Sequence, residues 1–259
     1  MSNICAISKD RYQGKSWRAV ADYRHTLKEA IVPLVASELP GAVLHYPIAF
    51  VTSEKGHQLV GVQGIDASSN LQVTSRGKWI GSYLPKAYRL HPFMLVGTTE
   101  GNKALCIDEN AALISDKEEG EAFFLADGEV SPKLSEKLQA LAELEKEKAG
   151  MEALCSVFAE LELIEPWEIV VTKGNEQKRL EGLFKISETR LNALPPDKLG
   201  ALRDVGGLVV AYCQLLSMQN MQKLAKQHLD REKAEQEANK NLQSFGLNAN
   251  DGLLSFDNL

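Results

Sequence analysis

A segment of fifteen residues, from Trp79 to Phe93, combines the side-chain types that proteins use to recognise other molecules. Aromatic rings supply large apolar contact areas, prolines stiffen the backbone, and an arginine pairs with a carboxylate or a phosphate through two N–H groups. We therefore predict a rigid recognition surface here. Its candidate binding residues are Trp79, Tyr83, Pro85, Arg89, His91 and Phe93. The alternative is a core-forming loop, in which the rings are packed inside and Arg89 is paired internally.

Histidines and carboxylates in the same half of the chain raise the question of a metal site. A facial triad needs two imidazoles and one carboxylate that converge on one ion. The potential ligands are His45, His57, His91, Glu54, Asp66 and Asp108. No two of them have a spacing that fixes them on one strand or helical face, so we predict unrelated histidines, no metal and no cofactor. His228 and Glu232, at i and i+4, are expected to form a solvated pair on a helix.

Familiar catalytic motifs are absent from the sequence. It contains no phosphate-binding GxxxxGK, no GxGxxG, no HExxH, no CxxC and no GxSxG, and each of these motifs encodes a geometry that its chemistry needs. The acidic runs at 116–121 and 143–147 are too polar to hold a buried acid–base pair. The sequence therefore favours a protein that is not an enzyme, and it identifies no catalytic residue.

The composition is typical of a globular protein, with 44% hydrophobic and 25% charged residues. A net charge of -6 argues against nucleic-acid binding, because neutralising phosphates supplies most of that affinity. No apolar run approaches the length of about 18 residues that a membrane span needs, and no secretory signal is visible. We expect a cytoplasmic protein with reduced thiols rather than two disulfides. The cysteines are Cys5, Cys106, Cys155 and Cys213.

The first half of the sequence alternates turn signals with short apolar runs. From Trp17 to Glu38 the pattern predicts one or two short helices, interrupted at Pro33 and stopped by Leu39-Pro40-Gly41. The acidic segment 110–124 is expected to be a partly irregular connection. Two antiparallel pairs of strands are predicted, 47–52 with 58–62 and 93–97 with 104–107.

Helical signals dominate the residues after 130. Ser131-Pro132 is a cap residue followed by proline, which is typical of a helix start. Leucines three or four residues apart from Leu134 to Leu144 place an apolar face on this helix. The periodicity resumes after Gly150 and stops at Glu165-Pro166, so we predict two consecutive helices or one long bent helix.

The C-terminal third combines one more hairpin with a final helical region. The hairpin is predicted from 169–172 and 179–186, and the helical region starts at Pro195-Pro196-Asp197. The apolar stretch from Leu208 to Leu216 predicts a buried helix. The charged stretch from Lys226 to Asn241 predicts that the last helix leaves the core and runs into solvent.

Together these elements predict an α+β fold with a single core. Its antiparallel β-hairpins occupy two halves, about 45–108 and 166–187. The helices at 131–163 and 197–228 are expected to join the two halves. Alternating strand patterns followed by helical runs favour this class over a doubly wound parallel sheet.

The two halves also resemble each other in sequence. Short apolar patterns correspond between 45–71 and 166–192. This weak repeat is interpreted either as an internal duplication or as chance similarity between two hairpins. For the domain organisation, we expect one domain over 1–245 and a mobile tail over 246–259.

The tail ends in a segment with four large apolar residues, Leu253, Leu254, Phe256 and Leu259. Apolar residues at a mobile terminus suggest a segment that docks onto a partner or onto a second copy of the chain. A homo-oligomer formed through the last helix and this tail is therefore one hypothesis. The alternative is that the tail packs on its own domain.

Short motifs spread along the chain carry a family resemblance. They are Tyr46-Pro47-Ile48-Ala49-Phe50, Asn70-Leu71, Gly77-Lys78-Trp79, Tyr83-Leu84-Pro85, Arg89-Leu90-His91-Pro92-Phe93 and the stretch from Leu180 to Glu188. Over about residues 10–225 the chain resembles the SapC family. Lys86 stands where that family usually has a small residue, and His91 stands where tyrosine is common. Roles of side chains in this loop are therefore less transferable from the family.

This resemblance implies a biological context rather than a mechanism. The family's name comes from bacterial surface-layer production, and its members are commonly encoded near flavin-dependent halogenase-like proteins, cupin-type proteins and outer-membrane receptors. We expect a non-catalytic accessory or binding protein that recognises a peptide or a partner protein. The alternative is an enzyme or enzyme subunit that modifies peptides or small molecules, in one version with a metal. Elemental analysis of protein purified without a chelator separates the two.

Overall fold

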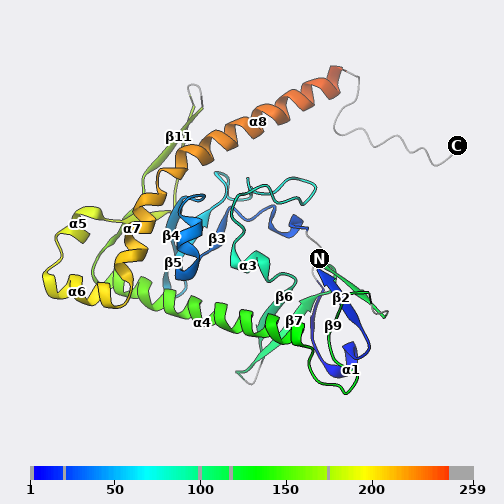
Figure 1. Cartoon of the computed structure of the whole chain (residues 1–259). Helices are drawn as coiled ribbons and strands as arrows, with labels where there is room; N and C mark the ends of the chain where they lie inside the picture. Colours follow the sequence, from blue (N-terminus) through cyan, green and yellow to red (C-terminus); the bar gives the residue numbers. More distant parts are fainter. Residues whose placement is uncertain (1–2, 20–21, 99–100, 117–118, 174–175, 245–259) are drawn as a thin grey trace.

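The centre of the molecule is a five-stranded antiparallel sheet (Figure 1). Its strands are β3 (Ile31–Pro33), β4 (Ile48–Ser53), β5 (Gly56–Val62), β10 (Ile164–Pro166) and β13 (Phe184–Ile186), in the order β10-β13-β4-β5-β3. The first predicted hairpin is confirmed as β4 and β5. β13 comes from the second half of the chain and meets β4 where Phe184 lies opposite Phe50. Strands from the two predicted halves therefore share this sheet, although the pair 93–97 and 104–107 of the first half lies in another sheet.

The structure is a computed structural model that describes all residues except 1–2, 20–21, 99–100, 117–118, 174–175 and 245–259. The 246–259 tail predicted from the sequence lies outside the described residues. Helices and several small antiparallel sheets together confirm the α+β class.

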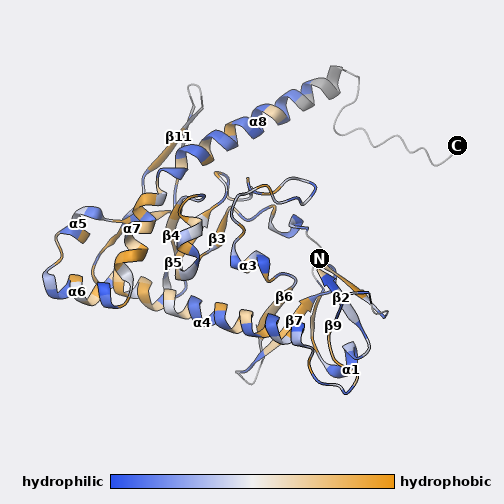
Figure 2. Ribbon diagram, viewed as in Figure 1, coloured by the Kyte–Doolittle hydropathy of each residue, from blue (hydrophilic) through white to orange (hydrophobic). Residues whose placement is uncertain are grey.

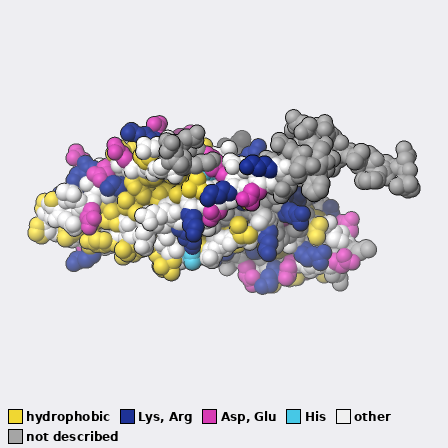
Figure 3. All heavy atoms as spheres, turned by 90° about the horizontal axis from the view of Figure 1, so that it is seen from above, with side chains coloured by type: hydrophobic (Ala, Val, Ile, Leu, Met, Phe, Trp, Pro, Cys, Tyr) yellow, Lys and Arg dark blue, Asp and Glu magenta, His cyan; other side chains and the backbone are white. Residues whose placement is uncertain are grey.

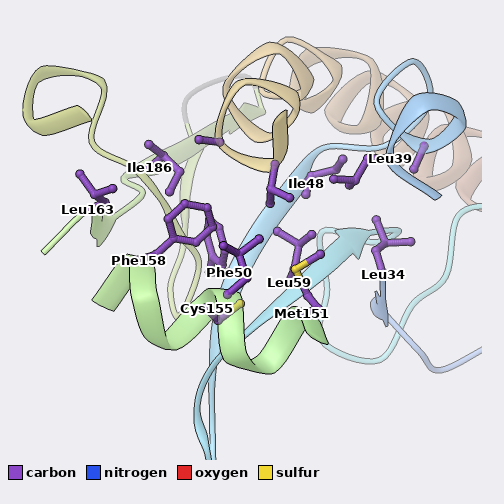
Figure 4. Packing of buried hydrophobic residues seen from close by; sticks show 14 of the residues in the cluster. Leu34, Leu39, Ile48, Phe50, Leu59, Met151, Cys155, Phe158, Leu163 and Ile186 are labelled. Carbon is purple, nitrogen blue, oxygen red and sulfur yellow. The ribbon is translucent and has the colours of Figure 1, made fainter. Parts of the chain in front are cut away.

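One face of the central sheet packs against the long helix α4 (Pro132–Glu160). Ser131 caps this helix, since its side-chain oxygen accepts a hydrogen bond from the Leu134 backbone N–H at 3.2 Å. The predicted helix start is thus confirmed, and one continuous helix forms. Phe50 of β4 meets Phe158 of α4 edge to face, with ring centroids 5.8 Å apart. Figure 4 shows this cluster between the sheet and the helix.

The opposite face of the sheet, called here the outer face, is covered by other elements. They are the hairpin of β11 (Ile169–Lys173) and β12 (Glu176–Leu180) and the first turns of α8 (Asn220–Ser244). This hairpin confirms the predicted pairing of 169–172 with the strand that follows it, but that second strand is shorter than predicted. It ends at Leu180, and residues 184–186 join the central sheet instead, because Gly182 has φ of +80° and breaks the strand.

In the weak repeat, Leu59-x-Gly61 corresponds to Leu180-x-Gly182, but the two glycines differ in their place in the fold. Gly61 lies within β5 opposite Ile48, whereas Gly182 lies between strands. The duplication therefore stays a hypothesis based on sequence alone.

A second body of strands surrounds the N-terminal end of α4. One three-stranded sheet has the order β1-β7-β6 and consists of β1 (Ile4–Ala6), β7 (Lys103–Asp108) and β6 (Phe93–Gly97). The other has the order β8-β2-β9 and consists of β8 (Ala112–Ser115), β2 (Ser16–Ala19) and β9 (Glu121–Ala122). The short helix α1 (Lys9–Tyr12) lies beside them. The predicted pairing of 93–97 with 104–107 is confirmed. Leu134 and Leu141 of α4 belong to this cluster of buried residues, so α4 connects it to the main core.

One prediction for this region was wrong. Trp17 lies in strand β2 rather than in a helix, and its ring packs against Phe93 with centroids 4.6 Å apart. The described part of the acidic segment 110–124 is partly irregular, as expected, and it also supplies both strands that pair with β2.

The stretch from 24 to 42 also differs from its prediction. It forms two single-turn 3₁₀ helices, strand β3, and helix α2 (Leu39–Ala42). Pro40 therefore lies in the first turn of α2 instead of stopping a helix, because a proline there forgoes only an N–H that has no helical partner.

The C-terminal helices are α5 (Glu188–Asn192), α6 (Pro196–Asp204), α7 (Gly207–Ser217) and α8. The prediction that 208–216 is a buried helix was half wrong, since one side of α7 faces solvent. α8 stays against the fold as far as Arg231, whose guanidinium donates to the carbonyls of Asn70 and Val73 at 2.8 and 2.7 Å. Beyond it, side chains from Lys233 to Glu237 are exposed, as predicted, and Figure 2 shows the hydrophilic character of this part.

Within the described residues, no single helix has both the length and the hydropathy to cross a membrane. α6 and α7 pass that test only when taken together, and they are bent by 89° relative to each other.

Candidate functional site

Internal hydrogen bonds fix the loop that the sequence identified as a recognition surface. The Trp79 indole N–H donates to the Tyr83 carbonyl oxygen at 3.2 Å, and the Tyr46 hydroxyl donates to the same oxygen at 2.5 Å. The Trp79 ring also contacts the rings of Tyr23 and Tyr88, with centroids 5.5 and 5.6 Å apart. These contacts agree with the alternative of a core-forming loop.

The six candidate residues do not form one exposed surface. Pro85 and Phe93 are buried, and Phe93 packs in the N-terminal cluster, away from Trp79. Tyr83 and Arg89 remain accessible. Arg89 is exposed, donates to the Tyr83 hydroxyl at 3.1 Å and lies 5.6 Å from the centroid of that ring. Trp79, Tyr83 and His91 are partly buried, so among the six residues only Arg89 is exposed.

Glu38 anchors the same loop, and the sequence reasoning missed it. Its side chain is buried, and one carboxylate oxygen accepts from the Lys86 backbone N–H at 2.7 Å and from the Tyr83 hydroxyl at 3.2 Å. The other oxygen accepts from the Val35 backbone N–H at 3.3 Å. Burial and the negative charge of Glu38 raise the pKa of Tyr83 to about 12, so the phenol remains a hydrogen-bond donor at neutral pH. Nothing in the local sequence distinguishes Glu38 from a solvated glutamate.

Lys86 connects the loop to α4. It begins the single-turn helix α3 (Lys86–Arg89), and its ammonium group donates to Glu147 and Ser37, both at 2.7 Å. Burial opposes ionisation of Glu147, but the hydrogen bonds from Lys86 and Ser37 outweigh it, so the pKa of Glu147 falls below its usual value. Lys86 therefore has a structural role in this chain, because it joins the loop to α4.

His91 stacks on His25 at the junction between the loop and the N-terminal strands. The two ring centroids are 3.7 Å apart and the ring planes differ by 21°. Within the described residues, the buried Nε2 of His91 has no hydrogen-bond partner. Burial, with a smaller contribution from the neighbouring His25, lowers the pKa of His91 to about 4. The stacked pair therefore stays neutral at physiological pH.

This neutral ring makes stability depend on pH. Between about pH 6.5, where an unfolded histidine titrates, and pH 4, the unfolded chain binds a proton that the folded chain does not. The contribution of neutral His91 to the free energy of unfolding is therefore fully present above pH 6.5, and it is lost as the pH falls toward 4. We expect His91 to contribute about 2 kcal/mol to this fall, after discounting the shift for solvent screening.

The variant His91→Phe keeps a ring on His25 but cannot titrate. Urea unfolding at pH 7.0 and pH 4.5 should show a smaller loss of stability for this variant than for the original chain. Equal losses in the two proteins would show that His91 does not carry the effect.

The remaining potential metal ligands lie on separate elements. His57 lies in β5 opposite Thr52, and its ring meets Phe184 edge to face at 5.2 Å. His228 is buried rather than solvated, with Asp66 and Glu232 oxygens 3.7 and 3.8 Å from its two ring nitrogens. Among the described residues, no three His, Cys, Asp or Glu side chains converge as metal ligands would.

A pocket of about 640 Å³ opens on the outer face of the central sheet. Val51 and Val62 of the sheet form its floor. Segments 28–31 and 64–67 line one side, and segment 179–183 at the end of β12 lines the other. A smaller pocket of about 280 Å³ shares residues 179–183, so this segment stands between two hollows.

The pocket combines an apolar interior with a charged rim. Apolar lining comes from Ala30, Ile31, Val51, Val62, Ile65, Ala67, Leu180 and Leu183, and the charges belong to Lys28, Glu29, Asp66, Arg179 and Glu181. Apolar walls with a few polar groups are typical of ligand-binding sites. The sequence reasoning did not find this site, because its two walls are more than 110 residues apart in the chain.

Strand β12 is an edge strand, and its last two residues line this pocket. Within the described part of the chain, β12 pairs only with β11. Arg179 and Leu180 at its end belong to the pocket wall. An unpaired strand edge offers backbone N–H and C=O groups to another extended chain.

Comparisons with known proteins give one match. A family model described as SapC matches residues 7–224 of the 259 in the chain. Neither the curated proteins nor the solved structures contain a match to this chain. The matched range includes the central sheet, the loop from Trp79 to Phe93 and both walls of the pocket. By this match over most of its length, the chain belongs to the SapC family.

Proposed function

We propose that this chain is a binding protein that recognises a peptide segment of a partner protein, and that the segment binds in the pocket beside β12. The observation that carries the proposal is the combination of an apolar pocket with an open strand edge. Proteins that bind peptides by strand addition use the edge for main-chain hydrogen bonds and a pocket for selected side chains.

The chemistry of the pocket indicates what kind of peptide would fit. The floor of Val51 and Val62 suits an aliphatic or aromatic side chain, since burying such a group provides most of the affinity. Arg179 and Glu181 are both exposed at the rim and carry opposite charges. We therefore expect the preferred peptide to have an apolar anchor flanked by charged residues of both signs.

The experiment starts from peptides selected on the immobilised chain from a random peptide library. Calorimetry then compares their affinity for the original chain and for Ala67→Trp. Ala67 is exposed and lines the pocket, so tryptophan there fills the cavity without disturbing the core. We expect affinity to fall at least about tenfold, which corresponds to about 1.4 kcal/mol of binding free energy.

The variant Arg89→Ala serves as the matched comparison, because it removes the exposed cation of the loop from Trp79 to Phe93. We expect it to bind the selected peptides as the original chain does. Unchanged affinity in Ala67→Trp, together with a loss in Arg89→Ala, would move the binding site to that loop. Selection of no peptide above background would contradict peptide recognition itself.

A further inference from the structure

A buried phenol holds the carboxylate of Glu29 at the rim of the large pocket. Glu29 is exposed and belongs to the pocket wall that segments 28–31 and 64–67 form. The Tyr88 hydroxyl donates to its Oε2 at 2.8 Å. Among the residues that the structure describes, no other group donates a hydrogen bond to this carboxylate. One oxygen is therefore oriented from inside the fold, and Oε1 can still accept a hydrogen bond from a ligand.

Packing fixes Tyr88 itself. The side chain is only 6% exposed, and its ring centroid lies 5.6 Å from that of Trp79 and 6.1 Å from that of His25. Its hydroxyl also lies 3.0 Å from Oε1 of Gln63. Burial and the hydrogen bond to Glu29 raise the pKa of Tyr88, so the hydroxyl remains a donor at neutral pH. The loop that contains Tyr88 thus reaches the pocket through this one hydrogen bond.

The backbone next to Glu29 is also fixed. The Ala30 carbonyl accepts hydrogen bonds from the N–H groups of Gln63 and Gly64 at 2.7 and 3.1 Å. These bonds join the two segments of this wall to each other. A charged group that is held in place before the ligand arrives loses little conformational entropy on binding, so more of its interaction energy appears as affinity.

The groups around Glu29 do not pair with its charge. Asp66 of the same wall faces α8, where Nδ1 of His228 lies 3.7 Å from its carboxylate. Burial lowers the pKa of His25, so this nearby ring is neutral at physiological pH. Lys28 precedes Glu29 in the chain, but no ion pair between described residues includes Glu29. Glu29 is therefore the carboxylate of this wall that a cationic ligand group can approach.

A general electrostatic field does not select the sign of a ligand in this chain. Seen from above, Lys and Arg side chains lie interspersed with Asp and Glu side chains (Figure 3). Salt screens exposed charges from one another beyond about 8 Å at physiological ionic strength. Selection by charge therefore depends on single groups in fixed positions, and Glu29 is such a group.

We propose that Glu29 binds a lysine or arginine side chain of the bound peptide, next to its apolar anchor, and that Tyr88 is the positioning residue for this contact. The inference rests on the proposed function and adds which wall of the pocket receives the cation. The cationic N–H groups donate to Oε1 of Glu29, while Oε2 stays on the Tyr88 hydroxyl. Hydrogen bonds between ionised groups are about twice as strong as those between neutral groups.

The test uses each peptide selected on the immobilised chain together with a partner peptide in which norleucine replaces the Lys or Arg. Norleucine keeps an apolar stem and removes the charge. Calorimetry gives the ratio of the two affinities, and we expect the basic peptide to bind the original chain about fivefold more tightly. This preference should disappear in Glu29→Gln and be at least about halved in Tyr88→Phe. A purely structural effect of either variant would weaken both peptides equally and leave the ratio unchanged.

The control is Glu143→Gln, which removes an exposed glutamate from α4 outside the pocket and should keep the full preference. Selected peptides without a basic residue, or norleucine partners that bind equally well, would overturn the inference and leave peptide binding standing. Loss of the preference in Glu181→Gln but not in Glu29→Gln would place the cation on the opposite wall. A full preference in Tyr88→Phe would contradict the positioning role. Selection of no peptide at all would contradict both this inference and the proposed function.

Discussion

Replacing Gln214 by leucine is expected to lower the free energy of unfolding by about 4 kcal/mol, because two buried backbone groups lose their partners. The Gln214 carboxamide oxygen accepts from the Ile186 N–H at 2.9 Å, and its NH₂ group donates to the Ile48 carbonyl at 3.1 Å. β13 and β4 share only the pair of Phe184 with Phe50. Gln214 thus bridges the two strands beyond the point where their own pairing stops.

Urea unfolding at pH 7 measures this loss, with Gln219→Leu as the matched control. Gln219 lies between α7 and α8 and is exposed, so its replacement should change stability by less than about 0.5 kcal/mol. A Gln214→Leu variant as stable as the control would show that water or a local shift satisfies both strands. The same bridge supports the sheet that forms the floor of the pocket, so peptide affinity should weaken along with stability.

Replacing Glu38 by alanine is expected to cost about 3 kcal/mol of stability. The change leaves the N–H groups of Lys86 and Val35 and the hydroxyl of Tyr83 without their acceptor. It also leaves a cavity at a position that is only 2% exposed. The loop around Tyr83 would then lose its attachment to the segment before α2, and amide hydrogen exchange should become faster there than in the central sheet.

Two variants separate this effect from a general effect of charge. Glu38→Gln keeps a side-chain oxygen as acceptor, so it should retain more than half of the stability lost in Glu38→Ala. Glu143→Ala removes an exposed glutamate from α4 and should change stability by less than about 0.5 kcal/mol. If Glu38→Ala unfolds at the same urea concentration as Glu143→Ala, the buried carboxylate does not hold the loop.

Each variant reports on a different part of the molecule. Replacing Gln214 or His91 tests how separate segments are joined. Replacing Glu38 tests the loop, and replacing Ala67 tests the pocket. A loss of peptide binding in Ala67→Trp with full stability therefore reports on the site itself. A loss of binding in Gln214→Leu reports on the sheet below it.

Elements that depend on neighbouring residues could be predicted from the amino-acid sequence. The hairpin of β4 and β5 follows from a β-branched and aromatic run before a two-residue loop at Glu54-Lys55 and from alternating apolar residues after it. The start of α4 follows from Ser131-Pro132, because the cap and the proline act within one helical turn. Family membership also follows from such local motifs, and the match over 7–224 confirms it.

Which faces are buried and which side chains meet depends on the three-dimensional fold. Gln214 binds Ile48 across 166 positions of sequence, and Glu38 binds Lys86 across 48. No local pattern encodes such pairs, because each depends on where a distant backbone group lacks a partner. For the same reason the apolar stretch of α7 was predicted to be buried, although Val209, Tyr212 and Leu216 face outwards while Val210 and Ala211 pack in the core. The pocket likewise exists only where segments 28–31 and 179–183 meet over the sheet.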